Sequence, residues 1–128
     1  MHFVYIKPCV LLIPQQVNDY DSYMYSLTAA NRSPSTSPAW FKAYSFKEAF
    51  GLQDLSPASL DRLVNNMAAS RALIRKYWEL KVKSGDLYLA QGCNDDCLKS
   101  HMCEIVTNEF NDNRKCNELV NIFDTRAS

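Results

Sequence analysis

The cysteines are the feature that most constrains this chain. Five stand among its 128 residues, and four crowd the last third, as Cys93, Cys97, Cys103 and Cys116 with the spacing C-x3-C-x5-C-x12-C. Zinc ribbons and fingers usually present C-x2-C pairs, or one such pair followed by paired histidines, whereas the only histidine nearby here is His101. We therefore expect a disulfide framework, no metal site, and an oxidising compartment.

Four cysteines allow three pairings, and their order in the sequence does not choose among them. Loop geometry favours Cys103 with Cys116, because the polar residues 111–115 between them are typical of a turn. A disulfide that closes a loop of this size stabilises the fold by roughly 3 kcal/mol on the chain-entropy model.

The other two cysteines, Cys93 and Cys97, are four residues apart. Inside a regular helix their Cβ atoms would be about 5–6 Å apart, which is longer than the roughly 3.8 Å that a disulfide prefers. This bond therefore requires Cys93 to lie just outside a helix. Gly92 permits the necessary turn, and Asp95 and Asp96 suit the first helical turn that follows.

Catalytic motifs are absent from the sequence. There is no nucleophile elbow, P-loop or dinucleotide fingerprint, and three glycines are too few to build one. The two histidines, His2 and His101, are too few for a multi-histidine catalytic metal centre. We assign no catalytic, metal-binding or cofactor-binding residue to this chain.

Charge and hydropathy exclude two kinds of partner. Fourteen basic residues balance fourteen acidic ones, which leaves no electrostatic footprint for nucleic acid or for an anionic membrane. No apolar run reaches the 18 residues of a transmembrane helix. The basic stretch 71–83 resembles a membrane-surface helix, but Glu79 interrupts it, and a solvated helix face is the favoured interpretation.

The first part of the chain predicts short strands. Residues 3–6 and 10–13 are β-branched and aromatic runs that Pro8 separates, and residues 20–27 form a third run. Two or three short strands do not make a stable independent sheet. We therefore expect them to complete a sheet that this chain does not supply. Residues 32–38 predict a loop.

The remainder predicts helices. One stripe precedes a stop at Gly51, and a second helix starts at Ser56-Pro57. One further helix is expected to end near residues 84–85 and another to cover about 94–107, and the tail from Asn117 is expected to add a short turn or helix. The expected apolar stripes, with their aromatic residues in the core, are Trp40, Phe41, Tyr44 and Ala49; Leu60, Leu63, Val64 and Met67; and Leu73, Ile74, Tyr77, Trp78 and Val82. The predicted fold class is mainly α: a small disulfide-stapled helical subdomain with two or three short N-terminal β-strands.

The sequence contains one N-glycosylation sequon, at residues 31–33, and it makes Asn31 the candidate glycosylation site. The N-terminus gives no clean signal peptide, because Lys7 and Pro8 interrupt the apolar stretch 3–13. A secreted type of cysteine pattern without such a signal predicts that the true N-terminus lies elsewhere. Cys9 has no predicted partner.

Several segments together resemble a known family. Residues 23–31, Tyr-Met-Tyr-Ser-Leu-Thr-Ala-Ala-Asn, are similar to the Tyr-x-x-Asn-Leu-Thr-x-Ala-Asn segment of acid sphingomyelinase and the acid sphingomyelinase-like phosphodiesterases. The order then continues as in the C-terminal region of that family, including the spacing of the cysteine ladder. The further similar segments are 38–40, 44–52, 55–60 and 77–78.

The resemblance covers residues 17–117, leaves 1–16 as a poorly matching segment and 118–128 as a tail, and implies the pairs Cys93–Cys97 and Cys103–Cys116. It also implies a secreted or lysosomal location and a helical subdomain packed on a metallophosphoesterase catalytic domain. In the family, two zinc ions and a bridging hydroxide attack the phosphorus of sphingomyelin or of nucleotide substrates. The motifs that hold those ions are absent here, and zinc is expected only in the parent catalytic domain.

Two functions follow as hypotheses. The first is the C-terminal structural subdomain of an acid sphingomyelinase-type phosphodiesterase, which is inactive alone and touches membrane lipid only through the parent enzyme. The alternative is a stand-alone secreted, disulfide-rich helical binding module without enzymatic activity. Exposed apolar surface discriminates them, because a subdomain leaves surface uncovered where its parent packs.

Overall fold

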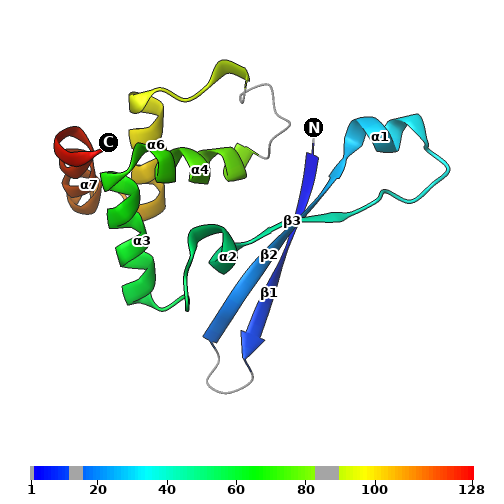
Figure 1. Cartoon of the computed structure of the whole chain (residues 1–128), viewed down its shortest axis with the longest axis horizontal. Coiled ribbons are helices and arrows are strands. Elements are labelled where there is room, and N and C mark those ends of the chain that lie inside the picture. Colours follow the sequence, from blue (N-terminus) through cyan, green and yellow to red (C-terminus); the bar gives the residue numbers. More distant parts are fainter. Residues whose placement is uncertain (1, 12–15, 83–89) are drawn as a thin grey trace. The chain divides into compact units, whose positions relative to one another are not determined.

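The computed structural model describes residues 2–11, 16–82 and 90–128, with side chains from residue 17 onward (Figure 1). The chain forms two compact units, Met1–Leu60 and Asp61–Ser128. The first holds the β-strands and two short helices, and the second holds the four-helix part with both disulfides. The predicted mainly helical, disulfide-stapled fold with a few N-terminal strands is confirmed. Residues 12–13 and the expected helix end at 84–85 lie outside the described residues.

The sheet of the first unit has three antiparallel strands in the order β1 (His2–Leu11), β2 (Gln16–Ser26) and β3 (Phe41–Ser45) (Figure 1). The predicted break at Pro8 is wrong, because β1 runs straight through this residue. β1 lies at an edge of the sheet, and an edge strand tolerates proline because one side of it needs no ladder hydrogen bonds. A register shift follows between Cys9 and Val10.

The third strand corrects a second prediction. The stripe from Trp40 to Ala49 was expected to be one helix, but it divides into β3 and the short helix α2 (Phe46–Phe50). Aromatic runs of this length fit either period, and tertiary contacts decide between them. Here Asp21 of β2 accepts a hydrogen bond from Ser45 Oγ at 2.5 Å and pairs with Lys42 Nζ at 3.0 Å, which fixes residues 41–45 to the sheet.

Helix boundaries in the first unit follow local rules. Ser26 caps α1 (Leu27–Arg32) by accepting the Ala29 N–H at 3.2 Å. Ser45 precedes α2 without capping it, and the Asp19 carboxylate of β2 accepts the Lys47 N–H instead, at 3.0 Å. Gly51 ends α2 as expected, with φ of 65°, a conformation that glycine adopts without strain. The loop predicted at 32–38 is found at 33–40, because Arg32 still belongs to α1.

The second unit is built on α3 (Pro57–Ala69), α4 (Arg71–Val82), α6 (Asp95–Val106) and α7 (Arg114–Arg126), of which α3 begins in the first unit. The predicted Ser56-Pro57 start is confirmed, since Ser56 Oγ accepts the Ser59 N–H at 3.3 Å. Helix α6 starts after Asn94, whose side chain accepts the Cys97 N–H at 3.0 Å. None of the helices in the described segments is long and apolar enough to cross a membrane.

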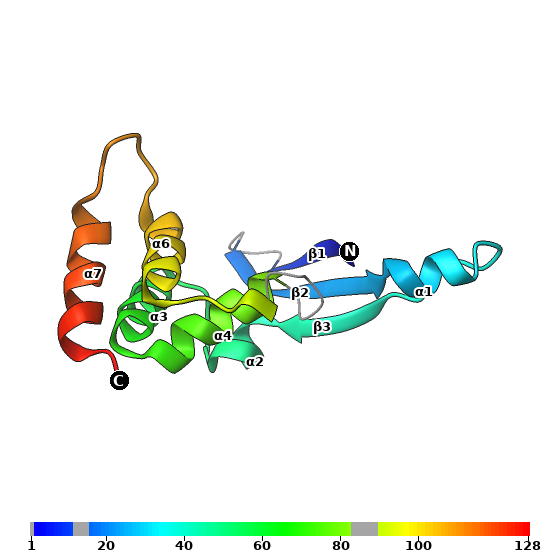
Figure 2. The ribbon, with the colours of Figure 1, turned by 90° about the horizontal axis from the view of Figure 1, so that it is seen from above.

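The core of the second unit takes side chains from all four helices. Its most deeply buried members are Met67, Ile74, Leu98, Met102, Leu119 and Phe123. The predicted stripes of α3 and α4 supply Leu63, Met67, Ile74 and Trp78 to it. The prediction that Leu60 faces the core is wrong, because it is 38% exposed in the first turn of α3. The turn that closes α6 and α7 into a hairpin is visible in Figure 2.

Matched leucine substitutions test this core. Leu98→Ala is expected to lower the free energy of unfolding by about 2–5 kcal/mol, because it leaves a cavity in a fully buried position. Leu60→Ala removes the same atoms from a partly exposed position and is expected to cost much less. Urea unfolding followed by circular dichroism measures both, and equal losses would contradict the assignment.

Candidate functional site

The two disulfides lie at the two ends of α6. Cys93 and Cys97 pair with a Cα–Cα distance of 5.3 Å, and Cys103 and Cys116 pair at 4.7 Å. The predicted pairing is therefore the one that the structure contains. Cys93 lies just before the helix, as its spacing from Cys97 requires, and Gly92 turns the chain there with φ of 73°.

The second disulfide joins the end of α6 to the start of α7 and closes the loop between them. That loop carries Asn111 with φ of 67°, a value that asparagine tolerates better than most residues, and Phe110, which is 96% exposed. Lys99 and Asp124 form an ion pair of 2.6 Å between the same two helices. The hairpin is thus fixed by a covalent bond at its tip and by ionic and apolar contacts along its length.

A second group of contacts is centred on Arg71, at the start of α4. Its guanidinium pairs with Asp95 at 2.9 Å, lies over the Phe123 ring at 4.7 Å and donates to the carbonyl of Ala127. The hydrogen bond from Arg71 lowers the pKa of the Asp95 carboxyl below its ordinary value. Sequence reasoning missed this role of Arg71, because its partners are 24 or more residues away and nothing in the local pattern indicates them.

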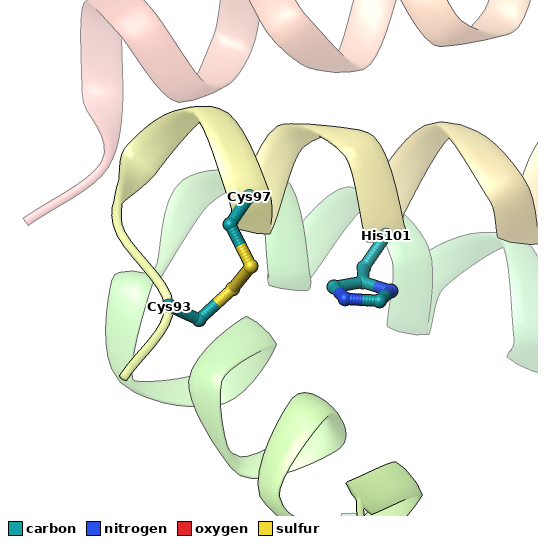
Figure 3. A group of neighbouring side chains, drawn as sticks. All are labelled: Cys93, Cys97 and His101. Atoms are coloured by element: carbon teal, nitrogen blue, oxygen red, sulfur yellow. A yellow bond between two sulfur atoms is a disulfide. The ribbon is translucent and has the colours of Figure 1, made fainter. Parts of the chain in front are cut away.

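The third group lies beside the first disulfide. His101 is one helical turn beyond Cys97, and ligand atoms of Cys93, Cys97 and His101 lie within 4.8 Å of one another (Figure 3). His101 Nδ1 lies 3.1 Å from Lys81 Nζ and 3.2 Å from Glu104 Oε2. The Lys81 ammonium is the main cause of a lowered pKa at Glu104. With the sulfurs bonded to each other, they are not thiolates, and this group holds no metal ion in its oxidised form.

Aromatic side chains contact one another in the first unit, but the prediction that the aromatic residues of the stripe beginning at Trp40 lie in the core is wrong for two of them. Tyr20 stacks on Phe46 at 4.6 Å between centroids, and Trp40 meets the Tyr25 ring edge-on at 4.7 Å. However, Trp40 and Phe41 are each 49% exposed. The reason is that a three-stranded sheet with only short helices cannot cover both of its faces.

Asn31, the candidate glycosylation residue, is exposed in the last turn of α1, and its occupancy stays a prediction. Cys9 belongs to β1, whose side chains are outside the described part, so its pairing stays open. The sequence analysis assigned no catalytic residue. The disulfides and the contacts of Arg71 and His101 are structural contacts and do not form a pair of nucleophile and base.

The fold and its disulfides define a small region of α and β structure that is built for an oxidising environment. Comparison with protein families matches residues 10–121 to the acid sphingomyelin phosphodiesterase C-terminal region. The chain belongs to this family.

Individual relatives agree with the family match. The sphingomyelin phosphodiesterase of Bos taurus is 27% identical over 104 residues, which are 81% of this chain and 16% of the relative. The acid sphingomyelinase-like phosphodiesterase 3b of Homo sapiens is 26% identical over 87 residues, 68% of this chain and 18% of the relative. Sphingomyelin phosphodiesterase 1 of Caenorhabditis elegans is 24% identical over 101 residues. The chain spans less than a fifth of the length of these relatives.

Acid titration tests the Arg71–Asp95 contact. Because the folded-state pKa of Asp95 is lowered from 3.8, its contribution to stability is present above that pH and is lost as the pH falls through the lower folded value. Asp95→Asn is therefore expected to flatten the decline of the unfolding temperature between pH 4 and pH 2. Glu79→Gln, which removes an exposed carboxylate of α4, is the control and is expected to keep the wild-type slope. Parallel slopes for wild type and Asp95→Asn would contradict the assignment.

Proposed function

We propose that this chain is the C-terminal structural region of a phosphodiesterase of the acid sphingomyelinase type, whose catalytic domain hydrolyses sphingomyelin or a related phosphodiester. The family match over residues 10–121 carries this proposal. The relatives align with this chain over 16–18% of their own length, which agrees with a match to one region of a larger phosphodiesterase. The zinc ions and the hydroxide that attacks phosphorus would belong to the catalytic domain.

The first unit is the part that we propose to pack on the catalytic domain. Within the described residues, the outer strands β1 and β3 of its sheet each pair with a strand on one side only, and proteins usually cover such edges. Apolar side chains are also exposed on this unit: Val17 is 50% exposed, and Trp40 and Phe41 are 49% exposed. Edge strands and exposed aromatic residues together favour a surface that another domain covers.

The second unit supplies stability in the environment where the enzyme works. A secreted or lysosomal location fits two disulfides, which persist in oxidising compartments. The pKa values of Asp95, Glu104 and Asp112 are all lowered, mainly by hydrogen bonds from cationic side chains. These carboxylates keep their charge, and hence their ion pairs, at mildly acidic pH.

A domain exchange tests the proposal. The segment of the Bos taurus relative that aligns with this chain is replaced by this chain, and the hybrid is expressed in secreting cells. We expect secreted phosphodiesterase activity that a chelator abolishes, and none from a hybrid without the segment. The chain alone is expected not to hydrolyse a phosphodiester reporter with zinc present. Activity of the chain alone, or a hybrid that behaves like the deletion while the reinserted native segment works, would overturn the proposal.

Substitution of two exposed phenylalanines tests which unit contacts the catalytic domain. Phe41→Lys in the hybrid is expected to reduce secreted activity severalfold, because it places a charge in the proposed contact. Phe110→Lys changes a still more exposed ring of the second unit and is expected to have little effect. Thermal unfolding of the isolated chain is the control for folding. Equal effects of the two changes would argue against the first unit as the contact surface.

Glycosylation of Asn31 is a separate prediction. When the chain is secreted from eukaryotic cells, we expect one glycan, seen as a mobility shift that an amidase specific for N-glycans removes. Asn31→Gln and Ser33→Ala are each expected to abolish the shift, because both destroy the sequon. Asn66→Gln, at an exposed asparagine outside any sequon, is expected to leave it unchanged. A shift that persists in Asn31→Gln would refute the site.

A further inference from the structure

The group formed by Cys93, Cys97 and His101 has the composition of a metal site, although two of its members form a disulfide. One ligand atom from each residue lies within 4.8 Å of the others. Figure 3 shows the His101 ring beside the disulfide, on the same side of α6 as Cys97. Thiolate and imidazole together are the ligands that zinc-class ions prefer.

The helix start positions all three residues. Cys97 and His101 are four residues apart in α6 and therefore lie one above the other on the same face. Cys93 lies outside the helix, directly before Asn94, whose side chain caps the helix by accepting the Cys97 N–H at 3.0 Å. The Cys93 side chain thereby lies beside the first turn, where it meets Cys97. The backbone hydrogen bonds of the helix start do not involve the disulfide, so we expect them to keep the three residues near one another when it opens.

We propose that, when a dithiol reductant opens the Cys93–Cys97 disulfide, Cys93, Cys97 and His101 bind one zinc-class divalent ion. In the first step the dithiol transfers two electrons and two protons, so that each cysteine becomes a thiol and the reductant becomes a disulfide. In the second step both thiols lose a proton as their sulfurs bind the ion, and His101 binds as neutral imidazole. Exchange with the disulfide form of the reductant reverses the process: that disulfide takes up two electrons and two protons to become the dithiol again, the Cys93–Cys97 bond re-forms, and the ion is released.

The distances permit this change without rebuilding the backbone. With metal–sulfur bonds of about 2.3 Å and metal–nitrogen bonds of about 2.0–2.1 Å, neighbouring ligands around a tetrahedral ion are roughly 3.3–3.8 Å apart. The imidazole lies within 4.8 Å of the sulfurs and needs to approach by about 1 Å, whereas the two sulfurs, bonded in the disulfide, must move apart by about 2 Å, which side-chain torsion changes can supply. Cys97 and His101 are only partly buried, which leaves the fourth position to water.

The contacts of His101 leave one ring nitrogen for the ion. In the tautomer with the proton on Nδ1, this N–H donates to Glu104 Oε2 at 3.2 Å, the Lys81 ammonium donates to the same carboxylate, and Nε2 is available to the metal. Lys81 Nζ lies 3.1 Å from the same Nδ1 and 2.5 Å from Glu104. Two thiolates neutralise a divalent ion, and the Lys81 charge opposes it, which predicts a site of moderate affinity that competes with the disulfide.

Cobalt(II) is the probe for this site, because thiolate ligands give it a charge-transfer band and a tetrahedral environment gives it intense visible absorption. The whole chain carries Cys9→Ser and keeps the Cys103–Cys116 disulfide, and the dithiol concentration is set so that mass spectrometry after alkylation finds only Cys93 and Cys97 reduced. After reduction with a dithiol and removal of the reagent, we expect one cobalt ion per chain with both spectral features. Zinc is expected to displace the cobalt, and the oxidised chain is expected to bind none.

Variants of the same chain separate the site from chance binding. Cys97→Ser is expected to abolish the thiolate band, and His101→Ala to weaken binding more than tenfold. Glu104→Gln is expected to weaken it by about tenfold, as for a residue that orients a ligand. Lys81→Met is expected to strengthen binding, because it removes a cation.

Circular dichroism of the reduced chain is the control for folding. Absence of cobalt binding, whether the helices persist or not, overturns the proposal, as does binding that is unchanged in both Cys97→Ser and His101→Ala. Cobalt binding that persists when Cys93 and Cys97 are both replaced by serine would belong to Cys103 and Cys116 and overturns it as well. None of these results bears on the family role, which the domain exchange tests separately.

Discussion

The disulfide between Cys103 and Cys116 is the constraint on which the second unit depends. It holds the end of α6 at the start of α7, so that Leu98 and Met102 of one helix and Leu119 of the other meet in a dry core. A unit of four short helices buries little apolar surface, and a covalent bond that restricts the unfolded chain compensates for this. Because the disulfide fixes the position of α6 relative to α7, the side chains of α3 and α4 pack on a hairpin of defined geometry.

Arg71 completes that unit in a different way. Its guanidinium contacts Asp95, the ring of Phe123 and the carbonyl of Ala127, and thereby connects the starts of α4 and α6 with the last turn of α7. A surface ion pair alone contributes little to stability. The contribution of Arg71 comes from combining charge, ring contact and backbone hydrogen bond in one planar group that lysine does not replace.

The two units differ in how complete they are. The second has a buried core to which its helices contribute, whereas the first is a three-stranded sheet with exposed aromatic residues, whose outer strands pair on one side only in the part of the chain that the structure describes. Such a sheet is typical of a part whose remaining cover comes from elsewhere. The proposed role rests on this difference. In it, the first unit contacts a catalytic domain, and the second unit supplies stability in an oxidising, acidic environment.

The sequence by itself determined the elements that depend on local chemistry. The Ser56-Pro57 start, the Gly51 stop and the requirement that a Cys93–Cys97 bond place Cys93 outside the helix follow from neighbours a few residues apart, whereas the full pairing is implied by the family resemblance. Only the tertiary structure decided the rest. Residues 41–45 became a strand because Asp21 binds Ser45 and Lys42 across the sheet, and Arg71 found Asp95 and Ala127 far along the chain. Contacts of that range carry no local signal, since they exist only once both partners are folded.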